Sequence, residues 1–457
     1  MASKHTLRSS EWFAGNDEVA LSHRVVMASV GLEVDPDNKR PIIGIADSSS
    51  ELNPCNLPLR DYIDDIKAGI IEAGGLPLVF SVMSLGEDLM KPSAMLYRNL
   101  LSMEVEEYLR SYPLDGVVLL ANCDKSVPGA LMGAASSNLP TIMFTAGARP
   151  AAIFKGKRIG TGTDLWRMWA EFRAGKISQD EWREFEGCLN CGLGACNTMG
   201  TASSVALMVE ALGLTLPGTS TIPSDDPARK VAAHNSGIEI VRMVNKQLLP
   251  STIMTPKAFR NAVRVLHACG GSTNALIHLL AISGRIGGEL TLPDIAKLGE
   301  NIPVLADVEP SGIGLIQDFH RAGGLPALAN ELKALLELDA ITLTGKTFGE
   351  QIVPRNESST AIRSINNPMR STGAFAVVSG NLAPKGAVIK VSAASPELLK
   401  HSGPALVFTG YEDMRARIDD PNLEVTKASI LVLAGCGAVG VPGMPEWGMI
   451  PIPKKLA

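Results

Sequence analysis

Strand-like apolar runs alternate with amphipathic helical stretches through about the first two-thirds of the chain. The run Pro41 to Ala46 precedes a helical stretch from Leu59 to Ala73. The run Leu76 to Ser81 precedes another near Met95 to Leu109, and a third run spans Gly116 to Leu120. This rhythm predicts an α/β fold in which a largely parallel sheet has helices on both faces, as three α/β/α layers. In such sheets, ligands bind at the carboxyl ends of the strands.

Later segments change in character. Helical patterns continue over Met199 to Leu212, Asp226 to Leu248, Pro256 to His267, Thr273 to Gly284 and Leu325 to Leu338. From about Thr360, short β-rich pieces punctuated by Gly and Pro take over, including Ala374 to Val378, Ala387 to Val391, Ala405 to Phe408 and Ser429 to Leu433. We therefore predict an α/β domain over residues 1–357 that carries the site, and a β-rich C-terminal domain over residues 358–457.

The composition limits the class of partner. The chain has 457 residues, of which 46% are apolar and 19% charged, and its net charge is −5. These values favour a globular protein acting on a small molecule, and they argue against nucleic acid as its main partner. The segment Met1 to His5 lacks an apolar signal region, and no apolar run reaches about 18 residues. We therefore predict a cytoplasmic protein without membrane contact.

Three cysteines lie in loop-like segments that are rich in small residues. The segments are Asn53 to Asn56, Asn122 to Lys125 and Gly194 to Gly200, and they contain Cys55, Cys123 and Cys196. Seven cysteines without regular spacing do not form a disulfide framework, whereas thiolates are the ligands of iron–sulfur clusters. We predict that the three cysteines bind one cluster and leave one iron position open for substrate. The alternative is three unrelated buried thiols.

Other motifs carry weaker signals. Cys188 and Cys191 form a single CxxC without a second pair, so packing in a loop is the preferred interpretation. The segment Gly160 to Asp164 lacks the GxxxxGK[ST] pattern of a phosphate loop. Ser272 and Thr273, which precede a helical stretch, are candidates either for substrate contact or for a plain helix cap.

Several ordered motifs resemble one family along essentially the whole chain. They are Glu51 to Asn56, Asn122 to Lys125, Gly194 to Ala202, Gly270 to Ala275 and Gly443 to Lys455. Together they are similar to the family of dihydroxy-acid, 6-phosphogluconate and aldonic-acid dehydratases. Arg8 to Phe13, Ser84 to Glu87 and Met95 to Leu100 resemble the sugar-acid branch, of the arabinonate and xylonate type.

The resemblance implies a hydro-lyase that converts an aldonic acid into its 2-keto-3-deoxy acid. In this family, the open iron of a [2Fe-2S] cluster binds the leaving C3 hydroxyl, while Mg²⁺ holds the carboxylate and the C2 hydroxyl. Lewis acids suit this reaction because hydroxide leaves poorly and the C2 proton is weakly acidic. By position, the Mg²⁺ ligands are Glu87, Asp124, Glu446 and Lys125 as a carbamate. Without the resemblance, these are ordinary surface or ion-paired side chains.

The family pattern also implies a barrel-like C-terminal domain that continues beyond Ala457. That continuation carries a Ser-Asp-Ala-Arg-Met-Ser-Gly motif whose serine acts as the base, so we expect this domain to be truncated and assign no base here. A homodimer or homotetramer is the family expectation. Two alternatives remain: a dihydroxy-acid dehydratase of branched-chain amino-acid synthesis, and a noncatalytic iron–sulfur protein.

Overall fold

A four-stranded parallel sheet lies at the centre of the first half of the chain. The computed structural model describes residues 6–91, 93–189, 192–436 and 450–457. The strand order is β2-β1-β3-β4. The bounds are β1 Ile42–Asp47, β2 Leu76–Ser81, β3 Gly116–Leu120 and β4 Thr141–Phe144. The central strand β3 is fully buried, which explains its unbroken apolar sequence. The prediction of parallel strands in an α/β fold is confirmed.

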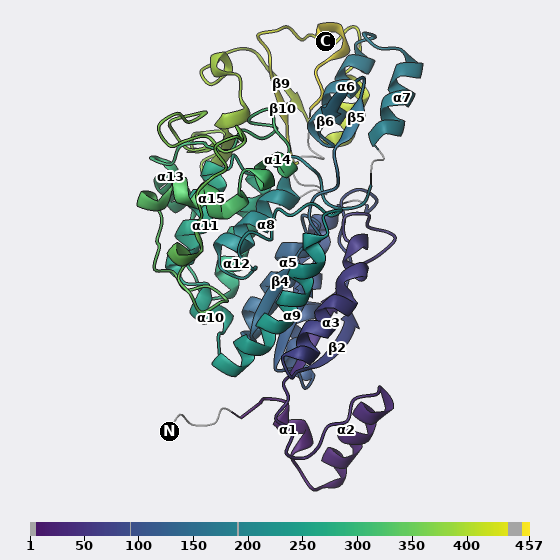
Figure 1. The fold of residues 1–457 in the computed structure, drawn as a ribbon. Coiled ribbons are helices and arrows are strands. Elements are labelled where there is room, and N and C mark those ends of the chain that lie inside the picture. The colour runs from purple at the N-terminus through teal and green to yellow at the C-terminus, as the bar shows by residue number, and fades with distance from the viewer. Residues whose placement is uncertain (1–5, 92, 190–191, 437–449) are drawn as a thin grey trace.

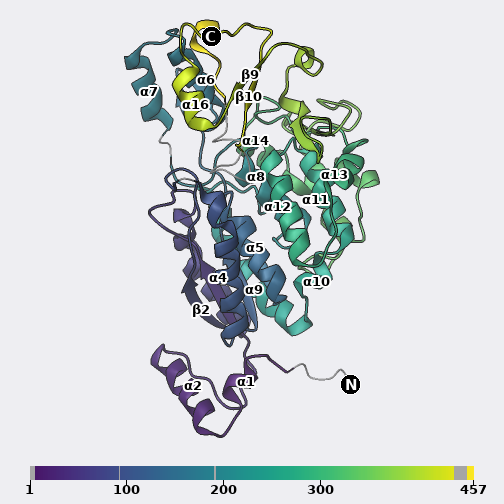
Figure 2. The same cartoon turned by 180° about the vertical axis from the view of Figure 1, so that it is seen from behind.

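Helices cover both faces of this sheet. Figure 1 shows α3 (Ile63–Glu72) and α9 (Ala228–Lys246) in front of the strands. Figure 2 shows α4 (Arg98–Ser111) and α5 (Ser126–Ser137) over the opposite face. The first pair packs so closely that a Cβ at Gly69 would lie 2.0 Å from a backbone oxygen of α9. Glycine is therefore needed at this helix crossing.

Further helices extend the core beside α5. They are α8 (Thr201–Ala211), α10 (Pro250–Ile253), α11 (Pro256–Ala268), α12 (Thr273–Arg285), α13 (Leu292–Gly299), α14 (Ile316–Arg321) and α15 (Gly324–Glu331). Their apolar side chains join those of the sheet in one large cluster. Four of these helices, α8, α11, α12 and α15, were predicted from sequence. The ends of the first three agree with the prediction to within two residues, whereas α15 ends at Glu331 and not at the predicted Leu338.

Two units were not predicted. The first joins the hairpin β5 (Ala152–Phe154) and β6 (Lys157–Ile159) to α6 (Thr163–Arg173) and α7 (Gln179–Leu189). It has a small core of its own, into which Cys188 of the CxxC motif packs, whereas Cys191 lies outside the described residues. The second consists of α1 (Ser10–Phe13) and α2 (Glu18–Ser29), beyond the far end of the sheet (Figure 1).

The last hundred residues form small sheets. β7 (Phe375–Val378) pairs with β8 (Ala387–Lys390), and β9 (Ala405–Phe408) pairs with β10 (Ile430–Leu433) beside α16 (Tyr411–Arg417). Within the described ranges these are two separate two-stranded sheets, so the barrel-like and truncated descriptions are not confirmed. The domain division at residue 357 stays a prediction. None of the helices described is both long and apolar enough to cross a membrane.

Candidate active site

Two cysteine loops meet at the carboxyl edge of the sheet. Cys55 lies in the loop after β1, and Cys123 lies in the loop after the neighbouring strand β3. The buried Asn56 side-chain oxygen accepts hydrogen bonds from the backbone N–H groups of Asn122 (2.9 Å) and Cys123 (2.8 Å). In return, the Asn122 side chain donates to the Cys55 carbonyl at 2.8 Å. Each asparagine thus holds the other cysteine's loop.

The third loop lies against the first. The Gly194 N–H donates to the Pro54 carbonyl at 3.2 Å, which connects the Cys196 loop to the Cys55 loop. The buried Asn197 accepts from the backbone N–H of Thr161 at 2.9 Å. Each of the three cysteines therefore has a neighbouring asparagine in the sequence. The side chain of each asparagine hydrogen-bonds a different segment of the chain and so holds the loops together. Sequence reasoning missed this role, although the repeated Asn–Cys adjacency was the signal that could have revealed it.

The three thiols interact through Cys55. The Cys123 thiol donates a hydrogen bond to the Cys55 sulfur, and this bond together with burial raises the pKa of Cys123 well above its ordinary value. Burial, followed by the negative charge of Cys55, raises the pKa of Cys196 to about 12. In a metal-free site, Cys123 and Cys196 therefore carry protons at neutral pH.

A half-buried cation and a carboxylate flank the sulfurs. Arg149 Nη2 lies 3.9 Å from Cys55 Sγ, and its Nε donates to the Gly194 carbonyl at 3.1 Å. Burial lowers the pKa of Arg149, but the charges of Cys196, Cys55 and Asp88 outweigh it, so the pKa is raised. Cys55 Sγ also lies 3.7 Å from Asp88 Oδ2. Neither Arg149 nor Asp88 was singled out from sequence.

An oxygen-rich cluster adjoins the sulfurs. The Lys125 side chain is completely buried, and its Nζ lies 2.7 Å from Asp124 Oδ2 and 3.1 Å from Glu87 Oε1. Asp124 Oδ1 also accepts from Cys123 Sγ at 3.5 Å. Asp124 therefore touches both groups, which is possible because the irregular loop turns adjacent side chains apart.

The donor atoms of these residues suit the two predicted cofactors, an iron–sulfur cluster and Mg²⁺. Three thiols, two of them buried and that of Cys196 half-buried, suit soft iron, and two carboxylates that already surround a positive charge suit a hard cation. Within the described ranges, no three His, Cys, Asp or Glu side chains form a ready-made metal site. Glu446 lies outside the described residues.

Comparison with known proteins identifies the family. Residues 40–351 match the model of the dihydroxy-acid/6-phosphogluconate dehydratase N-terminal domain, and residues 360–457 match that of the C-terminal domain. The chain belongs to this dehydratase family.

Among relatives of this dehydratase, 6-deoxy-6-sulfo-D-gluconate dehydratase of Pseudomonas putida is 45% identical over 100% of the chain and 80% of the relative. L-arabinonate dehydratase of Rhizobium leguminosarum bv. trifolii is 45% identical over 98% of the chain and 78% of the relative. Dihydroxy-acid dehydratase of Methanobrevibacter smithii is 38% identical over 93% of the chain and 78% of the relative. The resemblance inferred from sequence motifs is therefore confirmed.

The other predicted site residues of the dehydratase lie at the start of α12. Ser272 is the N-cap of this helix, and its hydroxyl accepts from the Asn274 N–H at 3.2 Å. It also hydrogen-bonds the hydroxyl of Thr201, the first residue of α8, at 2.9 Å. The structure thus places Ser272 and Thr273 beside the helix that follows the Cys196 loop. The capping role is observed, and the substrate role stays a prediction.

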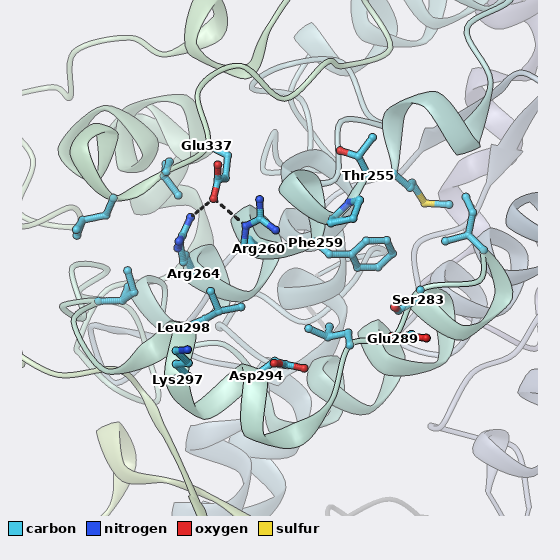
Figure 3. A pocket seen from close by; sticks show the side chains of 18 of the residues that line it. Thr255, Phe259, Arg260, Arg264, Ser283, Glu289, Asp294, Lys297, Leu298 and Glu337 are labelled. Atoms are coloured by element: carbon cyan, nitrogen blue, oxygen red, sulfur yellow. Dashed lines mark hydrogen bonds and ion pairs between the residues drawn. The ribbon is translucent and has the colours of Figure 1, made fainter.

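A large cavity of this dehydratase lies elsewhere, among α11, α12 and α13 (Figure 3). Its volume is about 1160 Å³, and an ion-pair cluster stands on its wall, with Glu337 Oε1 2.8 Å from Arg260 Nε and 3.2 Å from Arg264 Nη1. None of the three cysteines lines it. The cysteine loops remain the candidate site because the titratable side chains predicted from sequence come together there.

Proposed function

We propose that this chain is a hydro-lyase that removes water from an aldonic acid and forms the 2-keto-3-deoxy acid. The observation that carries the proposal is the meeting of Cys55, Cys123 and Cys196 beside the buried cluster of Glu87, Asp124 and Lys125. The relatives named as sulfogluconate and arabinonate dehydratases support a sugar acid as the substrate class.

The cofactor assignments follow from these donors. Cys55, Cys123 and Cys196 would hold a [2Fe-2S] cluster, and Glu87, Asp124, carbamylated Lys125 and Glu446 would hold Mg²⁺. When bound, the open iron and Mg²⁺ would supply Lewis-acid chemistry, at the leaving C3 hydroxyl and at the carboxylate and C2 hydroxyl respectively.

Lys125 has a specific part in this proposal. As an ammonium, it neutralises Glu87 and Asp124, from which its Nζ is 3.1 Å and 2.7 Å distant. Carbamylation joins the Lys125 nitrogen to the carbon of CO₂ and releases two protons from the ammonium, so a positive charge becomes a negative one. Three anionic groups in a buried site then require a divalent cation, because unpaired buried charges are costly.

Other residues would bind and orient the substrate. The backbone N–H groups at the starts of α8 and α12 offer positive potential to an anionic substrate, and Ser272 and Thr273 would contact it there. Asn56, Asn122 and Asn197 would keep the three cysteine loops in place. The base that removes the C2 proton is not assigned.

The wider setting remains part of the proposal. We propose a cytoplasmic homodimer or homotetramer that acts on a freely diffusing polyhydroxy acid, without nucleic acid or membrane as partners. Residues 1–357 would form the α/β domain, and residues 358–457 would belong to a barrel-like C-terminal domain.

The test is 2-keto acid formation by protein purified anaerobically and supplied with iron, sulfide and Mg²⁺. The substrates are pentonates, hexonates and branched 2,3-dihydroxy acids, with Cys123→Ser protein as the inactive control. We expect product from at least one aldonate, at a higher kcat/KM than from any branched acid. Preference for branched acids would instead indicate a dihydroxy-acid dehydratase. An intact cluster without any product would favour a noncatalytic iron–sulfur protein.

A further inference from the structure

Arg98 determines which nitrogen of the buried His278 ring carries the proton. Arg98 Nη1 lies 2.8 Å from His278 Nδ1. Because a guanidinium can only donate hydrogen bonds, His278 Nδ1 must accept, which requires a neutral ring with its proton on Nε2. Burial, followed by the positive charges of Arg98 and Lys125, also lowers the pKa of His278 well below its ordinary value. The His278 ring is therefore a neutral hydrogen-bond donor at Nε2.

This donor is unpaired. His278 is completely buried, and its Nε2 has no hydrogen-bond partner within the described ranges. Buried donors are almost always paired, because an unpaired one has lost its bond to water without a replacement. The equally buried His267 shows the usual arrangement: its Nε2 donates to the Ile295 carbonyl at 3.1 Å, and only its acceptor nitrogen is unpartnered. The His278 Nε2–H therefore indicates an oxygen acceptor on a group that binds or forms beside it.

The ring lies near the buried cluster of Glu87, Asp124 and Lys125. Lys125 is the N-cap of α5, and both α12, which carries His278, and α4, which begins at Arg98, pack against α5 (Figure 2). A Cβ at Gly129, one turn beyond Lys125, would lie 3.2 Å from the Arg98 carbonyl oxygen. As an ammonium, Lys125 can only donate, so it cannot pair with His278. A carbamate on the same nitrogen carries two oxygens that accept.

The charge of Arg98 points to the same kind of group. Among the described residues, no carboxylate pairs with Arg98, and its buried Nε has no partner. Burial, followed by the charge of Arg285, lowers the pKa of Arg98 to about 10. A cation in such a place is costly unless an anion lies nearby, and a carbamylated Lys125 is an anion.

We propose that His278 is a positioning residue for the Lys125 carbamate: its Nε2–H donates to a carbamate oxygen, and Arg98 holds the ring in the tautomer that this bond requires. The inference rests on the carbamate of the proposed function. Hydrogen bonds from guanidinium to imidazole and from imidazole to carbamate strengthen one another, because charge assists the chain at both ends. With its proton on Nε2 and Nδ1 bonded to Arg98, the ring orients the carbamate without competing for Mg²⁺.

The first test determines the tautomer. Nitrogen-15 NMR of protein labelled at histidine distinguishes the two ring nitrogens, and loss of signals in His278→Gln protein assigns them. We expect the wild-type His278 ring to be protonated at Nε2 alone, and Arg98→Met protein to show a mixture of tautomers. Arg285→Met is the control, because Arg285 also lies beside α4, where it pairs with Glu106. A wild-type ring that is charged, or protonated at Nδ1, would overturn the proposal.

The second test measures the carbamate itself. Protein in Mg²⁺ buffer is titrated with carbon-13 bicarbonate, and carbon-13 NMR follows the carbamate signal, which Lys125→Met protein identifies by its absence. We expect His278→Phe to raise the half-saturating bicarbonate concentration by about tenfold, since a hydrogen bond to a charged group is lost. His278→Gln should stay near wild type because its amide nitrogen can replace Nε2 as the donor. His267→Phe is the matched control and should not change the titration.

The outcomes separate this inference from the proposed function. Wild-type protein without a carbamate signal would overturn both the carbamate at Lys125 and the role of His278. Equal bicarbonate titrations of wild-type and His278→Phe proteins would overturn the role of His278 alone, even if the variant bound substrate more weakly. If His278→Phe does not fold, Arg98→Met decides, because it leaves the ring in place: weaker carbamate formation supports the proposal, and an unchanged titration overturns it.

Discussion

The candidate site has a sulfur half, made of Cys55, Cys123 and Cys196, and an oxygen half, made of Glu87, Asp124 and Lys125. The two halves lie side by side, but their charge is balanced in different ways. Burial and mutual contact raise the pKa values of Cys123 and Cys196, so these two thiols keep their protons at neutral pH. The oxygen half keeps its charges, because the Lys125 ammonium lies between Asp124 and Glu87. A cluster would therefore displace protons from the sulfur half, whereas a cation could enter the oxygen half only if the lysine lost its positive charge.

The largest expected effect concerns the sulfur half alone. Cys123→Ser removes a ligand that the proposed cluster requires, so we expect the visible absorption of protein reconstituted with iron and sulfide to disappear. Cys269→Ser is the matched control, since Cys269 is a buried thiol of the core cluster, away from the three loops. If Cys123→Ser protein kept the absorption of the control, the three-cysteine assignment would be wrong.

A second prediction concerns the protons on the sulfurs. Because the pKa of Cys196 is raised to about 12 from an ordinary value near 9, its thiolate fraction at pH 8 is expected to be about a thousandfold lower in the native, metal-free protein than in the unfolded chain. Alkylation by iodoacetamide, followed by peptide mass spectrometry, should be slower by at least that factor. The native rate should rise about tenfold per pH unit, and a plateau below pH 9 would contradict the raised pKa.

The third prediction concerns the oxygen half. Lys125→Met leaves two mostly buried carboxylates without their cation, so we expect the free energy of unfolding of metal-free protein to fall by about 3–5 kcal/mol. Lys155→Met is the control because Lys155 pairs with Glu181 at the surface, where solvent screens the pair and the loss should be much smaller. Urea unfolding monitored by circular dichroism measures both. Equal losses would show that burial does not distinguish these pairs.

The smallest expected effect concerns the positive charge of Arg149 and the reduction potential of the proposed cluster. Its guanidinium lies 3.9 Å from Cys55 Sγ, so Arg149→Met removes a positive charge beside the proposed cluster. We expect the reduction potential to become more negative by about 60 mV, the equivalent of a tenfold change for one electron. Potentiometric titration measures this shift, and Arg149→Lys should retain most of the wild-type potential. An equal shift in both variants would indicate a packing role instead.

Local patterns predicted most of the sheet and its covering helices. The strands from Leu76 to Ser81 and from Gly116 to Leu120 agree with the prediction residue for residue, because both are short, mostly apolar runs. The second is fully buried, whereas the first lies at the edge of the sheet and is partly exposed. Helix α2 was missed because its apolar residues show little periodicity. The unit that contains α6 and α7 was missed because its small core draws on separate segments.

The candidate site was likewise predictable from the sequence only in part. The motifs around Cys55, Cys123 and Cys196 are visible in the sequence, and they indicated that three cysteine thiols come together at one site. Arg149 and Asp88 were not predicted: Arg149 lies in a segment without a motif of its own, and Asp88 directly follows the segment Ser84 to Glu87, in which only Glu87 was assigned a role. The role of the neighbouring asparagines likewise depends on which loops they bridge.

The sequence by itself determined the α/β framework, the family and the residues expected to serve as ligands, because hydrophobic periodicity and motif spacing are local properties of a chain. Only the tertiary structure decided that Asn56 and Asn122 hold each other's cysteine loops, and that Lys125 is buried between two carboxylates. Those facts depend on distances between residues far apart in the chain, and burial changes the energy of each charge by an amount that no local pattern records.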